Sequence, residues 1–99
     1  MKYEIVYLPL VFEDIKESKL FYNSRLKGLG NEYVNLVKSE FKIIEKNPLL
    51  FEIKYNNTRV AFLEKFPIGI HFEIQEQTNV IVVKSVLHTA RNPELWKNR

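Results

Sequence analysis

The first half of the chain contains one alternating segment followed by two helical segments. Residues 3–7 alternate between the two faces of an extended chain and predict a strand, which ends before Pro9 because proline cannot donate to a sheet. Over residues 10–26 the apolar side chains recur at the spacing of an amphipathic helix. Gly28-Leu29-Gly30 interrupts this pattern, and a second amphipathic run continues to Asn47-Pro48. The two runs predict a helical hairpin with a glycine turn.

The second half of the chain predicts three strands, which cover residues 58–66, 68–74 and 80–87. The middle strand alternates strictly between apolar and polar side chains, as expected for a half-buried strand. The last strand is apolar at nearly every position, which is typical of a central strand. Asn56-Asn57 and residues 75–79 are turn signals, and residues 49–55 form a connecting loop or a short strand.

This β-α-α-β-β-β order predicts an α+β fold over a single domain, residues 1–99. We expect the helical hairpin to pack on one face of a small, twisted and mainly antiparallel sheet. In the first of the three later strands, we expect Val60, Phe62 and Phe66 to point into the core. The other sheet face is then open, and the alternation assigns six residues to it: Arg59, Leu63, His71, Glu73, Lys84 and His88.

Composition excludes several classes of protein. The chain has 99 residues, 45% of them hydrophobic, which is enough to build a core, and its lack of cysteine excludes disulfides and thiolate metal sites. The N-terminus does not resemble a signal peptide, and no apolar run approaches the roughly 20 residues that span a bilayer. We therefore expect a cytoplasmic protein without a membrane partner.

The net charge of +3 is concentrated at the C-terminal end. Residues 1–83 contain 11 basic and 11 acidic side chains, whereas residues 84–99 contain four basic side chains and one acidic one. A local positive patch attracts nucleic acid or an acidic protein partner. The alternative interpretation is a solvated basic terminus without a ligand.

Three local features, taken in order along the chain, resemble the RelE/ParE superfamily of bacterial toxins. The first is the glycine turn followed by a helix that ends at Asn47-Pro48. The second is Arg59 followed by the segment Lys65-Phe66-Pro67-Ile68-Gly69-Ile70. The third is a hydrophobic last strand that ends at Leu87-His88 and is followed by Arg91-Asn92-Pro93 and Trp96. Together with the element order, which spans essentially the whole chain, they make the chain similar to this superfamily.

The resemblance implies a toxin of a type II toxin-antitoxin module, held inactive in a hetero-oligomer with a cognate antitoxin. One branch of the superfamily poisons DNA gyrase, another cleaves messenger RNA on the ribosome, and some members lack toxicity. The fold alone does not choose among these activities. A separate possibility is a non-enzymatic module that binds nucleic acid through its basic end.

Messenger RNA cleavage would need a proton-transfer group and cations for the growing phosphate charge. The resemblance makes His88, Arg91 and Arg59 the catalytic candidates, although a packing residue that caps the strand end is the more ordinary interpretation of His88. A wider set of candidates could contact the target: Arg59, Lys65, His71, Lys84, Arg91, Lys97 and Arg99. The nuclease branch carries a cation on its third strand, where this chain has Ile68 and Gly69. That departure favours the gyrase-directed branch or an inactive member.

The remaining candidates are structural. Pro93 can begin a helical turn that returns Trp96 to the domain as an anchor, and a solvated surface position is the more ordinary interpretation of His71.

The two histidines and the scattered carboxylates lack metal-ligand spacing, and Gly28-x-Gly30 is not a nucleotide-binding loop. We expect no metal and no cofactor.

Overall fold

A computed structural model describes residues 2–89 of the chain. Its elements, in chain order, are β1 (Glu4–Tyr7), α1 (Pro9–Arg25), α2 (Leu29–Lys46), the short 3-10 helix η1 (Pro48–Leu50), β2 (Ile53–Tyr55), β3 (Thr58–Phe62), β4 (Ile68–Gln75) and β5 (Val80–His88). The five strands form one sheet in the order β1-β5-β4-β3-β2. Strand β1 runs parallel to β5, and the other neighbours are antiparallel.

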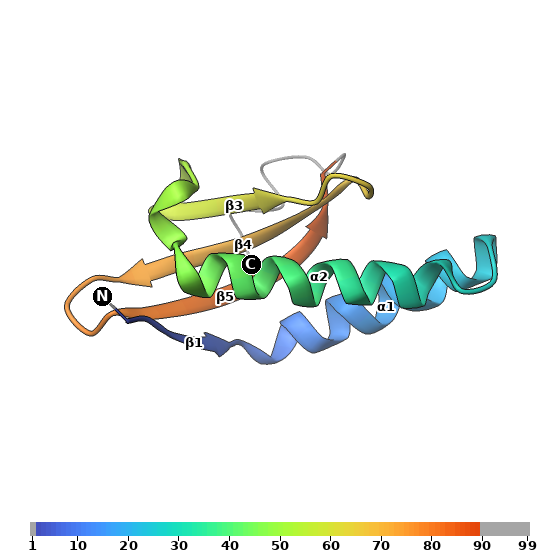
Figure 1. The fold of residues 1–99 in the computed structure, drawn as a ribbon, viewed down its shortest axis with the longest axis horizontal. Coiled ribbons are helices and arrows are strands. Elements are labelled where there is room, and N and C mark those ends of the chain that lie inside the picture. The colour runs from blue at the N-terminus through green and yellow to red at the C-terminus, as the bar shows by residue number, and fades with distance from the viewer. Residues whose placement is uncertain (1, 90–99) are drawn as a thin grey trace.

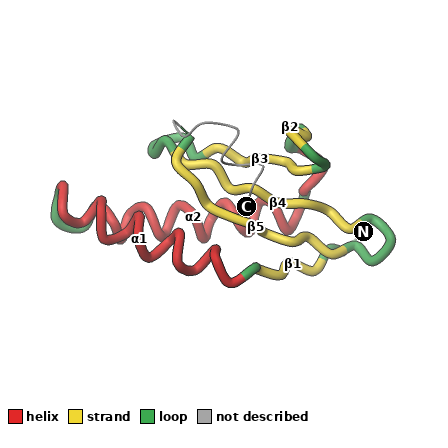
Figure 2. Tube along the Cα trace, turned by 180° about the vertical axis from the view of Figure 1, so that it is seen from behind, coloured by secondary structure: helices red, strands yellow, loops and turns green. Residues whose placement is uncertain are grey.

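The two helices pack side by side on one face of the sheet (Figures 1 and 2). This arrangement confirms the predicted α+β fold and its β-α-α-β-β-β order. Residues 49–55, which the sequence assigns to a connecting loop or a short strand, contain the end of η1 and the short edge strand β2. No helix within residues 2–89 is long and apolar enough to cross a membrane.

The glycine turn has two different physical roles. Gly28 adopts a left-handed backbone with φ of 85°, where glycine avoids the steric cost of a side chain. Gly30 already belongs to α2, and a Cβ atom built on it would lie 2.2 Å from the backbone oxygen of Lys19. Its N–H donates to Oδ1 of Asn23 at 2.7 Å. Gly30 is therefore a point where the two helix backbones approach closely.

The predicted turns are confirmed. Asn56 and Asn57 have φ values of 39° and 58°, the left-handed pair that a two-residue hairpin of type I′ requires. They connect β2 to β3 across the paired residues Tyr55 and Thr58.

The core lies between the helices and the sheet. Helix α2 contributes Tyr33, Val37 and Ile44, all fully buried. The rings of Tyr22, Tyr33 and Phe66 meet with centroids 4.8 to 5.6 Å apart, a spacing typical of favourable aromatic pairs. Strands β4 and β5 form the floor of the core.

The predicted phase of β3 is wrong by one residue. Arg59 lies opposite Phe72 and Ala61 opposite Ile70, so these β3 residues share the helix face with the core. Leu63, just beyond the strand, is buried in the same core. Phe62, predicted in the core, is 48% exposed. Strand β3 is apolar on both faces, and its periodicity therefore does not determine its phase.

The predicted position of His88 is also wrong. A bulge interrupts the pairing of β4 with β5 between His71 and Phe72, and it inserts Lys84 as an extra residue in β5. Beyond this bulge the phase of β5 is reversed. His88 consequently lies opposite Ile68, on the helix face.

Candidate functional site

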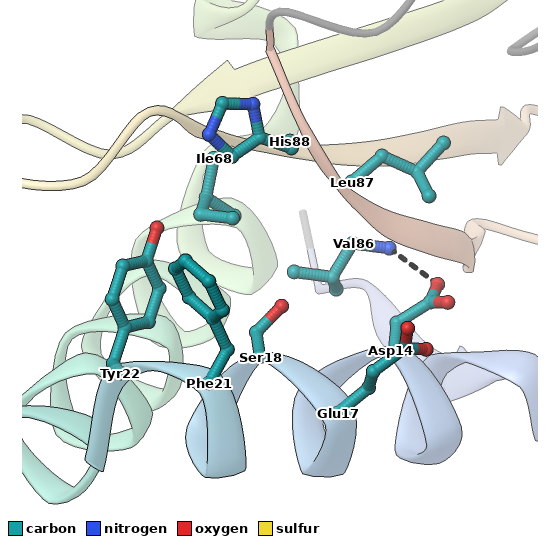
Figure 3. Close-up of a pocket in the computed structure, with 9 residues that line it drawn as sticks. All are labelled: Asp14, Glu17, Ser18, Phe21, Tyr22, Ile68, Val86, Leu87 and His88. Carbon is teal, nitrogen blue, oxygen red and sulfur yellow. Dashed lines mark hydrogen bonds between the residues drawn. The ribbon is translucent and has the colours of Figure 1, made fainter. Parts of the chain in front are cut away.

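A cavity of about 400 Å³ lies between α1 and the end of β5 (Figure 3). Its lining consists of Asp14, Glu17, Ser18, Phe21, Tyr22, Ile68, Val86, Leu87 and His88. In the close-up, the α1 side chains point up toward the strand, and the His88 ring stands above Ile68. This α1–β5 cavity is where the structure places the predicted catalytic histidine.

The cavity exists because β1 is shorter than β5. The pairing of β1 with β5 stops at Tyr7 and Val83, and the N–H of Leu8 makes the last bond to Val83. Beyond it, the N–H of Val86 donates to Oδ2 of Asp14 at 2.9 Å. A helix carboxylate thus takes the place of a strand carbonyl, because a buried backbone N–H is costly to leave unpaired.

Asp14 was not among the residues predicted for the site. It is only 9% exposed, and it occupies the buried side of α1 between Val11 and Tyr22. A sequence signal for it existed, since Asp14 falls three residues after Val11, at a position where the apolar stripe of α1 would otherwise continue. A carboxylate at such a position indicates a buried hydrogen-bonding partner.

The charges around the cavity disfavour phosphate. Two carboxylates, Asp14 and Glu17, line it together with His88, and no Lys or Arg of residues 2–89 does so. A site for phosphodiester cleavage needs cations where negative charge develops. The α1–β5 cavity is better suited to a neutral or cationic group.

A second polar cluster lies on the face of the sheet away from the helices. Nδ1 of His71 and the hydroxyl of Tyr55 are 2.8 Å apart, and Nζ of Lys84 donates to the hydroxyl of Thr58. The same Nζ is 3.8 Å from Oε2 of Glu73 and 5.6 Å from the centre of the Tyr55 ring. We call Tyr55, Thr58, His71, Glu73 and Lys84 the sheet-face cluster.

Two expectations about this face need correction. His71 is only 1% exposed, so it is a buried, hydrogen-bonded histidine and does not have the solvated surface position expected from its strand pattern. The face is also not fully open, since Thr58, Val60, Ser85 and Leu87 are buried as well. The Lys84 charge is balanced by Glu73, which leaves the sheet-face cluster without a net positive charge.

Two other predicted cations within residues 2–89, Arg59 and Lys65, are bonded to groups of the chain itself. An Arg59 nitrogen donates to the backbone oxygen of Phe51, which ties β3 to the segment before β2. Lys65 forms an exposed ion pair with Glu32 in the first turn of α2. Exposed pairs of this kind contribute little stability.

The structure does not bring the predicted catalytic residues together. Arg59 and His88 pair with positions of β4 that are four residues apart, about 13 Å along the strand. Their β-strands also lie on opposite flanks of β4. The candidates Arg91, Pro93, Trp96, Lys97 and Arg99 fall outside the described residues. Within residues 2–89 no group of three His, Cys, Asp or Glu side chains could hold a metal ion.

Comparison with solved structures identifies the fold. A chain of the chromosomal ParDE TA system from P. aeruginosa aligns with a TM-score of 0.77 at 11% identity, covering 88% of this chain and 96% of that chain. The toxin-antitoxin complex RelBE2 from Mycobacterium tuberculosis gives 0.59 at 13% identity, covering 89% and 99%. The archaeal RelE-RelB complex from Pyrococcus horikoshii OT3 gives 0.62 at 11% identity, covering 93% and 100%.

Sequence comparisons add no closer relative. No family profile matches the chain, and no curated protein matches it. The resemblance predicted from the sequence is therefore confirmed at the level of the fold, which is that of the RelE/ParE toxin-antitoxin structures.

Proposed function

We propose that this RelE/ParE-fold chain is the toxin of a type II toxin-antitoxin module, neutralised by a cognate antitoxin, and that its target is DNA gyrase. The observation that supports the toxin assignment is the match over nearly the whole length of chains from three toxin-antitoxin systems. The order of elements and the local motifs of the sequence point to the same superfamily.

The choice of gyrase rests on the chemistry of the described residues. Ribosome-dependent cleavage needs a base, an acid and a cation around one phosphate. In this chain His88 lines a cavity whose other charged residues are the carboxylates Asp14 and Glu17, and Arg59 is bonded to the backbone oxygen of Phe51. Ile68 and Gly69 are buried and uncharged where a nuclease would carry a cation. The predicted catalytic residues within 2–89, His88 and Arg59, therefore do not assemble such a site.

Two parallel assays on the purified chain test the target. We expect it to reduce supercoiling by gyrase and to leave messenger RNA intact in a translating extract. Messenger RNA fragments mapped to the ribosomal A site, and abolished by His88→Ala and Arg91→Ala, would overturn the gyrase assignment. Heat-denatured protein is the control for both assays.

The sheet-face cluster favours messenger RNA cleavage as the second candidate function. It groups a tyrosine, a histidine, a lysine and a carboxylate, which are the types of side chain that transfer protons and stabilise charge. Its members are already bonded to one another, and His71 is buried, so access to a phosphate would need rearrangement. Cleavage that is lost in both Tyr55→Phe and Lys84→Met would support this function over the first.

A further inference from the structure

The α1–β5 cavity has apolar walls that come from three elements. They are formed by Phe21 and Tyr22 of α1, Ile68 of β4, and Val86 and Leu87 of β5. In Figure 3 the two rings rise from α1 toward Ile68, and their centroids are 5.3 Å apart. A volume of about 400 Å³ is within the range of sites that bind small molecules. The cavity is therefore large enough for the apolar body of a ligand.

The charged groups on α1 that line the cavity are negative. They are the buried carboxylate of Asp14 and the exposed one of Glu17, and Glu17 forms no ion pair with another residue of 2–89. The guanidinium of Arg25 lies over the Phe21 ring, 4.9 Å from its centre, but Arg25 is not part of the lining. Because water screens a buried carboxylate less than an exposed one, this negative charge acts strongly on a group inside the cavity.

A buried hydroxyl lies next to the same wall. Tyr33 is fully buried, and its hydroxyl has no hydrogen-bond partner of good geometry within residues 2–89. Burial raises the pKa of this hydroxyl to about 12, with further effects from Ser18, Tyr22 and Asp14, all of which line the cavity. A buried polar group without a partner is costly, so hydrogen-bonding capacity remains on this side of the cavity for a ligand with N–H groups.

The arrangement of the ligating groups favours an organic cation over a metal ion. No group of three His, Cys, Asp or Glu side chains in the described part of the chain could hold a metal. Ammonium, amidinium and guanidinium groups, in contrast, bind to one or two carboxylates through charge-assisted hydrogen bonds. Aromatic walls attract the same cations, as the contact of Arg25 with Phe21 illustrates.

We propose that the α1–β5 cavity binds an organic cation, in which an ammonium, amidinium or guanidinium group is attached to an apolar body. The charged group bonds to the carboxylates of Asp14 and Glu17, and the body lies against Phe21. The bond from the Val86 N–H to Oδ2 of Asp14 stays in place, because an ionised carboxylate can accept about four hydrogen bonds. This site does not depend on the toxin function proposed above.

Three ring compounds of similar shape and different charge test the proposal on the full chain. Benzamidine is the cation, benzamide the neutral counterpart and benzoate the anion. Calorimetry measures their affinities, and the amide NMR signal of Val86 reports binding at the cavity, since this N–H donates to Asp14. We expect benzamidine to shift this signal and to bind with a Kd below about 1 mM, at least about tenfold more tightly than the other two. Equal affinities of the three compounds would overturn the proposal.

Neutral variants of the carboxylates test the origin of the charge preference. Asp14→Asn keeps an oxygen for the Val86 N–H, and benzamidine should bind to it about tenfold more weakly. Glu17→Gln should weaken benzamidine about threefold, because this side chain is exposed. Glu13→Gln, exposed on α1 outside the lining, is the control and should leave the affinity unchanged.

Benzamide should bind to all three variants as it does to the wild type. If benzamidine binds equally to Asp14→Asn, Glu17→Gln and Glu13→Gln, the proposal fails. If Asp14→Asn does not fold, the comparison of Glu17→Gln with Glu13→Gln decides alone.

A matched apolar pair tests the aromatic wall. Phe21 is 49% exposed and lines the cavity, whereas its neighbour Leu20 is 63% exposed and does not. Phe21→Ala should weaken benzamidine about tenfold, and Leu20→Ala should have no effect. A loss in Leu20→Ala without one in Phe21→Ala would place the binding site outside the cavity.

Two guanidinium compounds distinguish a free small molecule from a side chain of another protein. Butylguanidine reproduces the side chain of arginine alone, and N-acetylarginine amide adds the backbone. Weaker binding of N-acetylarginine amide would indicate that the ligand is a free small molecule. Equal or tighter binding would indicate an arginine side chain of a protein. A Kd above about 10 mM for benzamidine and for both guanidinium compounds would overturn the proposal.

Discussion

Helix α1 has two flanks that are used in different ways. Toward β5 it presents Asp14, whose buried carboxylate accepts a hydrogen bond from the Val86 backbone and completes the sheet edge. Toward α2 it presents Phe12, Lys16 and Lys19. The ring is largely exposed, and all three side chains line a groove of about 500 Å³ between α1 and α2, the α1–α2 groove. The first flank serves the fold, whereas the fold does not require the second.

The contrast shows where recognition is to be sought. Polar groups on the β5 flank and in the sheet-face cluster are bonded to partners within the chain. Rearranging them costs stability, because each lost partner leaves a buried polar group. The α1–α2 groove can gain contacts from a partner without losing any, which makes it the better candidate for binding a protein.

The largest effect should come from the close contact between the two helices. Gly30→Ala places a Cβ atom against the Lys19 backbone oxygen and forces α1 and α2 apart. We expect the free energy of unfolding to fall by about 3 kcal/mol in urea titrations, because overpacked backbone contacts relax poorly. Gly28→Asn is the control, since asparagine tolerates a left-handed backbone and the added Cβ meets no atom within 4 Å. Wild-type stability in Gly30→Ala would contradict the close approach.

Two substitutions, one on each flank of α1, compare how much each flank contributes to the free energy of unfolding. Asp14→Ala leaves the Val86 N–H unpaired and should cost about 2 kcal/mol of unfolding free energy. Phe12→Ala should cost less than about 1 kcal/mol, since the ring is mostly exposed. Glu17→Ala, on the same cavity but exposed, should be nearly neutral. If Phe12→Ala proved as destabilising as Asp14→Ala, the groove would be part of the folded core.

The buried aromatic cluster predicts an alkaline limit to stability. Burial raises the pKa of Tyr33 from its ordinary 10.0 to about 12. The unfolded chain therefore releases this proton first, and stability present below pH 10 is lost as the pH rises toward 12. At pH 11 the loss is on the order of 1 kcal/mol. Tyr33→Phe should lose less stability between pH 9 and pH 11 in urea titrations, and an unchanged slope would contradict the buried hydroxyl.

A smaller effect than those of Gly30→Ala and Asp14→Ala should come from the sheet-face cluster. Tyr55→Phe removes the hydroxyl that bonds to Nδ1 of His71, at a cost of about 1 kcal/mol. Growth inhibition should remain unchanged, because the proposed function assigns no chemistry to this pair. If Tyr55→Phe folds normally but no longer inhibits growth, the active surface lies on this face of the sheet.

The fold could be predicted from the sequence because its elements have distinct patterns. The sequence patterns place α1, α2, β4 and the glycine turn where the structure has them. The apolar stripe predicted for α1 is largely exposed at Phe12 and Leu26, and β4 is buried on both faces over Ile68–Phe72. The turn signal Asn56-Asn57 also agrees with the structure, where it forms the hairpin turn that connects the short strand β2 to β3. These features depend on local geometry, which a single sequence records well.

The site could not be predicted as well, because it depends on long-range register. Strand β3 is apolar on both faces, so the side of Arg59 was undetermined. A bulge beside Lys84 moved His88 to the helix face, and nothing in the local pattern of β5 signals it. Asp14 was visible only as a carboxylate in an apolar stripe, since its partner Val86 lies 72 residues away.

Induced expression in a bacterial host tests the central claim most directly, with growth followed in the presence and absence of the protein encoded by the neighbouring reading frame. Our account predicts that the chain alone arrests growth and that the co-expressed neighbour restores it. Normal growth with the stably produced chain alone would contradict the assignment of this protein as a toxin.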